Sequence, residues 1–187
     1  MSKNMLIGIG YRAGSGKDTV ANYLRSNHAF KRVAFADRLK YVVARLLDLN
    51  EWQEDEVFTL DFKDELQDFG LTGGQILQRV GVALREAIPG CWITCAQIKA
   101  KLESSHIVVT DVRFEDEAAH IKQLGGELWE VRRPVAHDTH VSETSGTKIQ
   151  WDRVIHNTGT IADLNAEVAR AFADAQRKHE KLVRPAS

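Results

Sequence analysis

A glycine-rich segment near the amino terminus constrains this 187-residue chain more than any other feature. Residues 10–19 have the sequence GYRAGSGKDT and follow the apolar run Met5–Ile9, which we expect to be a buried strand. A helix is expected from Gly16 to about Ser26. Small residues at such a turn let backbone N–H groups face one anion, and the helix amino terminus adds partial positive charge. With the full charge of Lys17, the segment predicts a phosphate-binding loop.

The loop departs from the general pattern G-x-x-x-x-G-K-[ST] at two positions. Tyr11 occupies the first glycine position, with Gly10 one residue early. Asp18 occupies the position of the hydroxyl that usually meets Mg²⁺, and a carboxylate there can hold the metal directly or through water. A glycine-rich turn without a ligand is the alternative, but it gives Lys17 little purpose. The residues expected to bind the phosphates of ATP are Ala13, Gly14, Ser15, Gly16, Lys17, Asp18 and Thr19, and Lys17 is also counted as catalytic.

Alternation of apolar runs with amphipathic segments predicts the fold class. Strands are expected at Met5–Ile9, Lys31–Phe35, Ile107–Thr110, Glu127–Val131 and Arg153–His156. Helices are expected at Gly16–Ser26, Asp37–Leu47, Thr72–Ala87 with Thr72 as the N-cap, Trp92–Glu103, Glu115–Leu124 and Ile161–Lys181. The order predicts an α/β three-layer sandwich, with a parallel sheet of about five strands flanked by helices. Residues 50–68 look irregular, and the polar stretch 132–151 is expected to form a mobile lid.

Bulk composition excludes several functional classes. The 25 basic and 26 acidic residues nearly cancel, and no block of like charge stands out, so a nucleic-acid polymer is not an expected partner. No apolar run reaches the length of a membrane span, and the first residues lack the form of a signal peptide. Cys91 and Cys95 have neither redox nor zinc spacing. A cytoplasmic protein is therefore expected.

The loop and four later segments resemble the deoxynucleoside monophosphate kinases of bacteriophages and their bacterial relatives, within the P-loop nucleotide kinase superfamily. The segments are FADRLK at 35–40, TGGQILQRVG at 72–81, VTDVRF at 109–114 and HVSE at 140–143. Asp18 fits this family, whereas Arg38 stands where a proline is usual. The resemblance extends from about Met5 to Leu164. It implies a P-loop kinase that uses ATP and Mg²⁺ to phosphorylate a deoxynucleoside monophosphate.

The resemblance also implies an organisation of the chain. Residues 1–187 would form one kinase domain, with an acceptor-binding helical region inserted at 36–100 and the lid at 132–151. The partner would be a small nucleotide, without nucleic acid or membrane, and family members suggest a homodimer. A bacteriophage origin, and with it the host cytoplasm, follows from the resemblance alone.

Two residues after the third strand are candidates for catalysis. Asp111 is expected at the carboxyl edge of the sheet beside the phosphate loop, where a carboxylate suits Mg²⁺, usually through water. Its alternative role is to cap the next helix. Arg113 can bind the acceptor phosphate in a bidentate way or pair with Glu115 or Glu117.

Further acceptor contacts are expected from the helical region. Asp37 starts a helix and is either an acceptor ligand or an N-cap. Gln75 and Arg79 share a helix face and can meet the base and the phosphate, or simply form an exposed polar surface. The other acceptor candidates are Arg38, Lys40, Arg85, Trp92, His140, Glu143 and Trp151. Trp92 can equally belong to the core, and Trp151 can anchor the hinge of the lid.

The lid and the last loop supply the remaining candidates. Arg132 and Arg133 are expected to close over the phosphates and exclude water, and Arg132 is counted as catalytic. Relatives hold adenine with a loop like the one after the last strand, so ATP contacts are expected at Asn157, Gly159 and Thr160. A capped turn with Thr160 as N-cap is the alternative. His137 and His140 lack a third ligand for zinc.

Other functions remain open at this point. Phosphomevalonate or dephospho-coenzyme-A kinases are the nearest alternatives, because the step Gly16-Lys17-Asp18 also occurs among phosphomevalonate kinases. Residues 75–81 and Phe114 favour the nucleotide kinase. A non-catalytic ATP-binding switch would lack a use for lid arginines. A kinase acting on nucleic-acid ends is disfavoured by the absence of a basic stripe.

Overall fold

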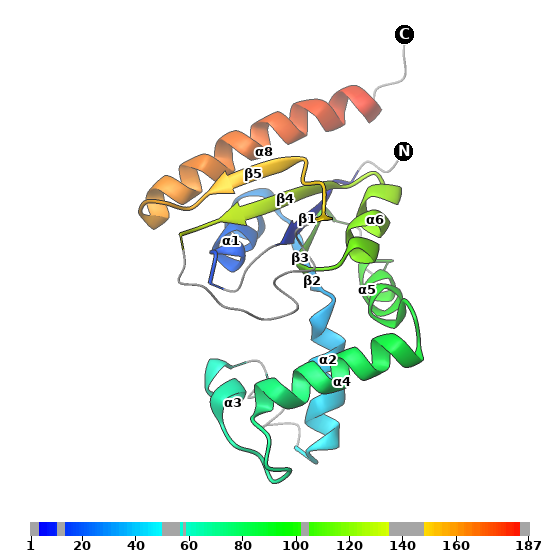
Figure 1. The fold of residues 1–187 in the computed structure, drawn as a ribbon. Coiled ribbons are helices and arrows are strands. Elements are labelled where there is room, and N and C mark those ends of the chain that lie inside the picture. Colours follow the sequence, from blue (N-terminus) through cyan, green and yellow to red (C-terminus); the bar gives the residue numbers. More distant parts are fainter. Residues whose placement is uncertain are drawn as a thin grey trace. The chain divides into compact units, whose positions relative to one another are not determined.

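A computed structural model describes residues 4–10, 14–49, 57, 59–101, 105–134 and 148–183, with the backbone alone at 60, 98–101 and 183. Within these residues, five strands form one sheet in the order β2-β3-β1-β4-β5 (Figure 1). The strands are β1 (Leu6–Gly10), β2 (Lys31–Ala34), β3 (Ile107–Val112), β4 (Glu127–Arg132) and β5 (Arg153–His156). All neighbouring pairs are parallel, so the predicted α/β sheet is confirmed.

The central strand, β1, positions the phosphate loop. It is buried from Ile7 to Gly10, as expected for a parallel strand that is covered on both faces. The chain leaves β1 at its carboxyl end, between β3 on one side and β4 on the other. In an open α/β sheet this point, where the strand order reverses, is where ligands bind.

Helices cover both faces of the sheet. On one face, α1 (Lys17–His28) and α8 (Ile161–Val183) share a buried core with Trp129 and Val131 of β4. On the other face lies α6 (Glu115–Gln123), because a Cβ added at Gly8 would meet Ile121 of this helix and Leu128 of β4. The unit therefore has the three layers that the sequence predicts.

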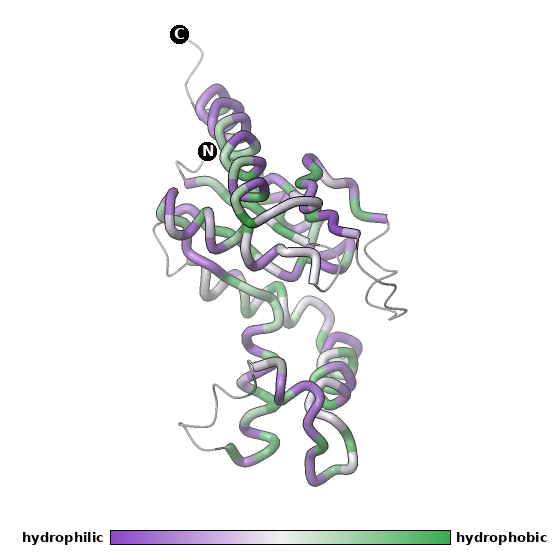
Figure 2. Tube along the Cα trace, turned by 90° about the vertical axis from the view of Figure 1, so that its left-hand side faces the viewer, coloured by the Kyte–Doolittle hydropathy of each residue, from purple (hydrophilic) through white to green (hydrophobic). Residues whose placement is uncertain are grey.

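The last helix is amphipathic and ends the described chain. Its buried residues recur every three or four positions, at Leu164, Val168, Ala171, Phe172 and Ala175. Figure 2 shows the corresponding alternation of hydrophobic and hydrophilic stretches along it. Among the described helices, none combines enough length with enough apolar residues to cross a membrane.

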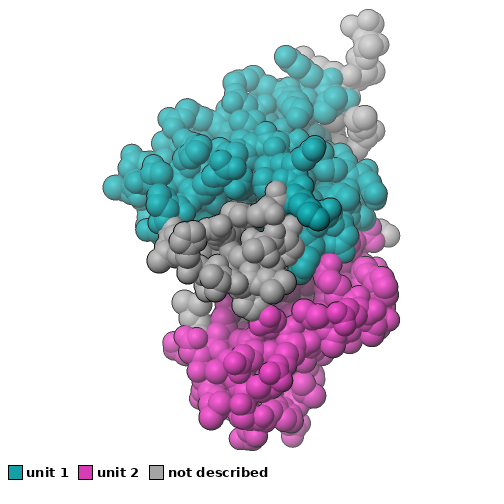
Figure 3. Space-filling model, viewed as in Figure 1, with its two compact units in different colours: residues 1–34, 99–187 teal, residues 35–98 magenta. Residues whose placement is uncertain are grey.

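The chain divides into two compact units (Figure 3). The sheet unit comprises residues 1–34 and 99–187, and the helical unit comprises residues 35–98. The helical unit holds α2 (Ala36–Leu46), α3 (Leu60–Asp64), α4 (Gly73–Ala87) and most of α5 (Cys91–Lys101). Its limits lie within two residues of the region 36–100 implied by the family resemblance. That this unit binds the acceptor stays a prediction.

Local capping determines where α4 begins. Thr72 Oγ1 accepts a hydrogen bond from Gln75 N at 3.3 Å, and Thr72 N donates to Gln75 Oε1 at 3.0 Å. This reciprocal pair is a capping box, which satisfies two backbone donors at the helix end. The predicted N-cap at Thr72 is confirmed.

The short helix α3 is a correction to the sequence analysis, which treated residues 50–68 as irregular. Thr59 Oγ1 accepts a hydrogen bond from Phe62 N at 3.2 Å and so starts the helix. Phe62 then enters the core of the helical unit with Val43, Ile76 and other apolar residues. A five-residue helix has too few turns to leave a periodic pattern, so packing rather than propensity stabilises it.

Two half-buried histidines at the amino ends of the strands predict acid sensitivity. His28 stacks on Phe172 with ring centroids 3.8 Å apart, and His106 Nδ1 accepts a hydrogen bond from Met5 N. Burial lowers the pKa of both side chains below 6.5, and like charge contributes, from His106 on His28 and from His179 on His106. The folded protein then binds fewer protons than the unfolded chain, so stability should fall as pH drops through and below 6.5.

Thermal unfolding at pH 7.5, 6.5 and 5.5 measures this dependence. His28→Phe should remove part of the loss at low pH, because it keeps the stacking on Phe172 without a titrating group. His156→Gln, a change at the exposed histidine that ends β5, is the control and should keep the wild-type dependence. A melting temperature that is constant over this range would contradict the prediction.

Candidate active site

The described part of the phosphate loop runs from Gly14 into α1. Gly14 (φ 72°) and Gly16 (φ 98°) both have left-handed backbone, which glycine adopts at little cost. Lys17 is the first residue of α1 and is only 8% exposed. Its Nζ lies 3.4 Å from Asp111 Oδ1 and 3.6 Å from Asp18 Oδ2. Ala13, predicted to contact ATP, lies outside the described residues.

Asp111 reaches Lys17 because β3 contains an irregularity. Gly8 of β1 pairs with Val109, but Gly10 pairs with Val112, so β3 has one extra residue in this stretch. Asp111 takes up the extra residue with φ 65°, a left-handed conformation that costs a non-glycine residue energy. Such bulges re-aim side chains at functional sites.

The structure rules out the helix-capping role considered for Asp111. The residue before α6 is Phe114, and the capping carboxylate belongs to Glu117. Glu117 Oε2 accepts hydrogen bonds from the backbone nitrogens of Arg113 (2.9 Å) and Phe114 (3.2 Å). Asp111 is therefore not required to start the helix.

Positive charge keeps Asp111 ionised. Burial on its own would raise the pKa of this carboxyl, but the charges of Lys17, Arg113 and Arg32 outweigh it, so the pKa lies below its usual value. Arg113 Nη2 lies 4.0 Å from Asp111 Oδ1. The structure thus brings together three of the four predicted catalytic residues, in the order Lys17, Asp111, Arg113.

A cavity of about 450 Å³ lies beside the loop, within the sheet unit. It is lined by Ser15, Glu130, Val131, Arg132, Arg133, Pro134, His156 and Thr158. Arg132, the fourth predicted catalytic residue, ends β4 on its wall. Cations on the wall and backbone N–H groups at the loop suit a ligand that carries phosphate.

Glu130 is a site residue that sequence reasoning missed. It is 4% exposed, and its Oε1 accepts a hydrogen bond from Arg132 Nε at 2.8 Å. Within the described part of the chain, Glu130 Oε2 and Ser15 Oγ are both buried without a hydrogen-bond partner. An unpaired buried carboxylate oxygen is costly, which points to a ligand or water. The available signal was a lone charge inside the apolar strand sequence LWEV.

The loop after β5 contacts the phosphate loop through Asn157. Asn157 is 8% exposed, and its Nδ2 donates a hydrogen bond to Ser15 O at 2.9 Å, so its side-chain amide is engaged by the phosphate loop. Thr160 Oγ1 accepts a hydrogen bond from Asp163 N, and Thr160 N donates to Asp163 Oδ2. The alternative of a capped turn is confirmed at Thr160. Contacts of ATP with Asn157, Gly159 and Thr160 stay predictions.

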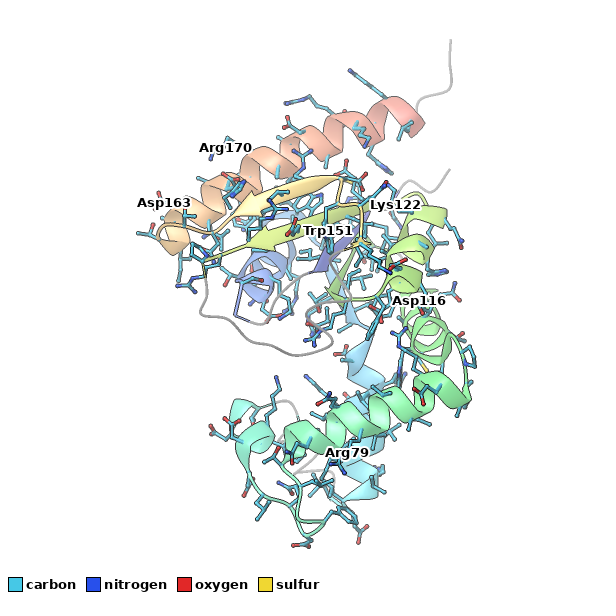
Figure 4. All side chains as sticks on the ribbon, viewed as in Figure 1. Arg79, Asp116, Lys122, Trp151, Asp163 and Arg170 are labelled. Atoms are coloured by element: carbon cyan, nitrogen blue, oxygen red, sulfur yellow. The ribbon has the colours of Figure 1, made fainter. Side chains whose placement is uncertain are left out.

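The acceptor candidates of the helical unit fall into buried and exposed groups. Asp37 is 4% exposed and is the second residue of α2, so the predicted N-cap role is wrong. Trp92 is 9% exposed and its Nε1 donates to Gly81 O at 3.2 Å, which favours the core role, while stacking on a base stays a prediction. Gln75 and Arg79 are exposed, and Arg79 is labelled in Figure 4, although Gln75 Oε1 belongs to the capping box. Arg38 is exposed, and Lys40 and Arg85 are half-buried.

The remaining acceptor candidates belong to the sheet unit and the lid. Trp151, labelled in Figure 4, packs over the end of β1, because a Cβ at Gly10 would overlap its ring. This contact fits a hinge anchor, while a contact with the acceptor stays a prediction. His140 and Glu143, and most of the predicted lid, lie outside the described residues. Arg133 is exposed where β4 ends.

Comparison with known proteins identifies the family. No protein-family model matches the chain. It is 31% identical over 193 residues, covering 92% of this chain and 98% of the relative, to a protein of Acanthamoeba polyphaga mimivirus named "Putative deoxynucleotide monophosphate kinase". The crystal structure of TT1252 from Thermus thermophilus shares the fold, with a TM-score of 0.51 and 17% identity over 91% of this chain and 97% of that one.

A dephospho-CoA kinase from Campylobacter jejuni aligns over 92% of this chain and 98% of its own, with 18% identity and a TM-score of 0.48. The mimivirus relative carries the assignment, because its identity extends over nearly the whole of both chains. This chain is a kinase and belongs to the deoxynucleotide monophosphate kinase family of P-loop kinases.

Proposed function

We propose that the protein transfers the γ-phosphoryl group of ATP to the phosphate of a deoxynucleoside monophosphate, giving ADP and the deoxynucleoside diphosphate. The observation that carries the proposal is the series Lys17, Asp111, Arg113 beside the phosphate loop, with cations on both sides of a carboxylate. Phosphoryl transfer requires positioning and positive charge around a transition state whose negative charge is spread over several oxygens. The name of the mimivirus relative supports the acceptor class.

Lys17 and Arg113 would each supply positive charge to the phosphates of a different substrate. Lys17 is the first residue of α1, directly after the glycine-rich loop, and it would bind the β- and γ-phosphates of ATP. Arg113, half-buried and two residues beyond Asp111, would bind the acceptor phosphate. The cavity beside Ser15 and Arg132 would hold the nucleoside of ATP.

The carboxylates near Lys17 fit a magnesium site that is completed by substrate. The described residues contain no group of three His, Cys, Asp or Glu side chains able to hold a metal. Asp18 and Asp111 nevertheless both approach Lys17. Mg²⁺ commonly keeps several waters and binds one or two carboxylates plus phosphates. When bound, it would neutralise phosphate charge, with Asp18 and Asp111 holding it directly or through water.

The acceptor nucleoside is assigned to the remaining candidates of the helical unit. Arg79, one turn beyond Gln75 on α4, keeps a surface position in the helical unit, and Gln75 retains its amide NH₂ group for a base edge. Asp37, Arg38, Lys40 and Arg85 complete the proposed set in that unit.

Release of ADP tests the proposal. With ATP and Mg²⁺ present, the acceptor panel would contain dAMP, dGMP, dCMP, dTMP, the ribonucleotides, phosphomevalonate and dephospho-coenzyme A. We expect strong stimulation by one or more deoxynucleoside monophosphates. Stimulation by a non-nucleotide acceptor alone would discard the roles of Gln75 and Arg79. Silence across the panel with ATP bound would favour a non-catalytic switch.

Arg113→Ala should weaken use of the acceptor. A charge-assisted contact is worth about 1.5–3 kcal/mol, so the acceptor KM should rise by roughly 10- to 100-fold while the Kd of ATP stays unchanged. Arg113→Lys should rescue only in part, because lysine lacks the bidentate geometry. Arg170→Ala on α8, an exposed arginine paired with Glu167 (Figure 4), is the matched control. A normal acceptor KM in Arg113→Ala would reject the assignment.

A further inference from the structure

The buried amide of Asn157 links the phosphate loop to a residue 142 positions away. Its Nδ2 donates a hydrogen bond to Ser15 O at 2.9 Å. Its backbone N–H donates to Arg132 O at 2.8 Å, at the end of β4. A single residue after β5 therefore contacts both the loop and the strand that carries the arginine of the cavity.

The geometry of an anion-binding loop creates the need for such a contact. Where peptide N–H groups converge on an anion, the carbonyl groups of the same peptides point away from it. Ser15 is only 1% exposed, so its carbonyl has little access to water, and a buried carbonyl without a donor costs roughly 1–3 kcal/mol. Asn157 supplies the donor. The hydrogen bond thus stabilises the loop orientation that presents N–H groups to phosphate.

Gly16 makes room for this contact. A Cβ at position 16 would overlap Asn157 Nδ2, and the φ of 98° also disfavours any other residue. The glycine that leads into α1 is therefore required both by the backbone turn and by the close approach of the asparagine amide. The two residues are adjacent in space although they come from opposite ends of the chain.

We infer that Asn157 is a positioning residue, which holds the Ser15–Gly16 peptide in the orientation that binds the phosphates and joins this loop to Arg132. The inference rests on the proposed binding of nucleotide phosphates by the loop. It assigns Asn157 a role that acts through the loop and not through contact with adenine. An aspartate of the same shape could not replace it, because a carboxylate would face the Ser15 carbonyl oxygen without a proton to donate.

Affinity for inorganic tripolyphosphate isolates this role, since that ligand carries no base. In titration calorimetry of the full chain, Asn157→Ala and Asn157→Asp should raise the Kd of tripolyphosphate and the Kd of ATP by the same factor, roughly tenfold or more. Loss of an adenine contact would weaken ATP alone. His106→Ala is the control: it removes one hydrogen bond, to Met5 N, at the opposite end of the strands, and should leave both affinities unchanged.

Protonation supplies a second readout that a general loss of stability would not produce. In Asn157→Asp, the introduced carboxyl is buried against the Ser15 carbonyl oxygen, which disfavours its charged form and raises its pKa, so that lowering the pH returns an O–H donor to this position. Its affinity for tripolyphosphate, taken as a ratio to wild type at each pH, should recover between pH 8 and pH 5.5, whereas the ratio for Asn157→Ala should stay constant. The pH dependence of Asn157→Asp is measured on folded protein, so it still tests the positioning role if Asn157→Ala fails to fold.

The outcomes separate the inference from the function on which it rests. If wild type binds tripolyphosphate and Asn157→Asp binds it equally well across this pH range, the positioning role is wrong while the phosphate loop stands. If wild type binds neither tripolyphosphate nor ATP, the proposed nucleotide binding fails first. A loss of affinity for ATP without a loss of affinity for tripolyphosphate would instead indicate that Asn157 contacts the adenine.

Discussion

Lys17→Ala is expected to lower kcat by roughly 100- to 1000-fold, the range seen when one group that stabilises transition-state charge is removed. Lys17 is the buried cation at the start of α1, where the loop backbone and the helix terminus already favour phosphate. The variant should still fold, because Arg113 and Arg32 continue to offset the charge of Asp111. Steady-state ADP release with saturating ATP and acceptor measures the effect.

Lys178→Ala is the matched control for this prediction. Lys178 also forms an ion pair, with Glu127 at 3.1 Å, but it lies exposed on α8. Its kcat should remain at the wild-type value. Wild-type turnover in Lys17→Ala, with circular dichroism showing an intact fold, would remove the argument for the phosphate loop.

Asp111→Asn is expected to reduce kcat by a similar factor, roughly 100-fold, with little change in melting temperature. Asparagine keeps the size of the side chain and tolerates the left-handed backbone of this position, so the bulge in β3 is preserved. The change removes the negative charge that faces Lys17 and that would help to hold Mg²⁺. The apparent Mg²⁺ requirement, measured as kcat against free Mg²⁺, should therefore shift to higher concentration.

Two further variants make this prediction specific. Asp116→Asn is the same chemical change on the exposed first turn of α6 (Figure 4), and it should leave the Mg²⁺ dependence unchanged. Asp111→Ala should lose activity and also stability, because alanine is strained in the left-handed backbone of this position and forms no ion pair with Lys17. An Asp111→Asn protein with wild-type kcat at every Mg²⁺ concentration would show that this carboxylate has no part in catalysis.

Local signals in the sequence were sufficient for most of the sheet unit. The turn from β1 into α1 is recognisable because small residues and a lysine occur together between an apolar run and an amphipathic run. Thr72 and Thr160 were correctly identified as possible caps because capping depends on residues within one helical turn. The parallel sheet followed from the alternation of strands and helices.

Several site residues could not be assigned in this way. Burial favours a core role for Trp92, and the start of α2 at Ala36 excludes an N-cap role for Asp37, and neither could be read from the local sequence. Glu130 was passed over because a charge within a strand sequence does not reveal whether it faces solvent or a cavity. Asp111 was placed at the correct edge of the sheet, but the bulge that turns it toward Lys17 depends on the register between β1 and β3.

The sequence by itself thus determined the elements, their order, the phosphate loop and the family, since each depends on residues that are close together along the chain. Only the tertiary structure decided which side chains meet. The hydrogen bond from Asn157 to Ser15 spans 142 residues, and the ion pair of Lys17 with Asp111 joins the start of α1 to the carboxyl end of β3. Such contacts are set by strand register and helix packing, which no local pattern encodes.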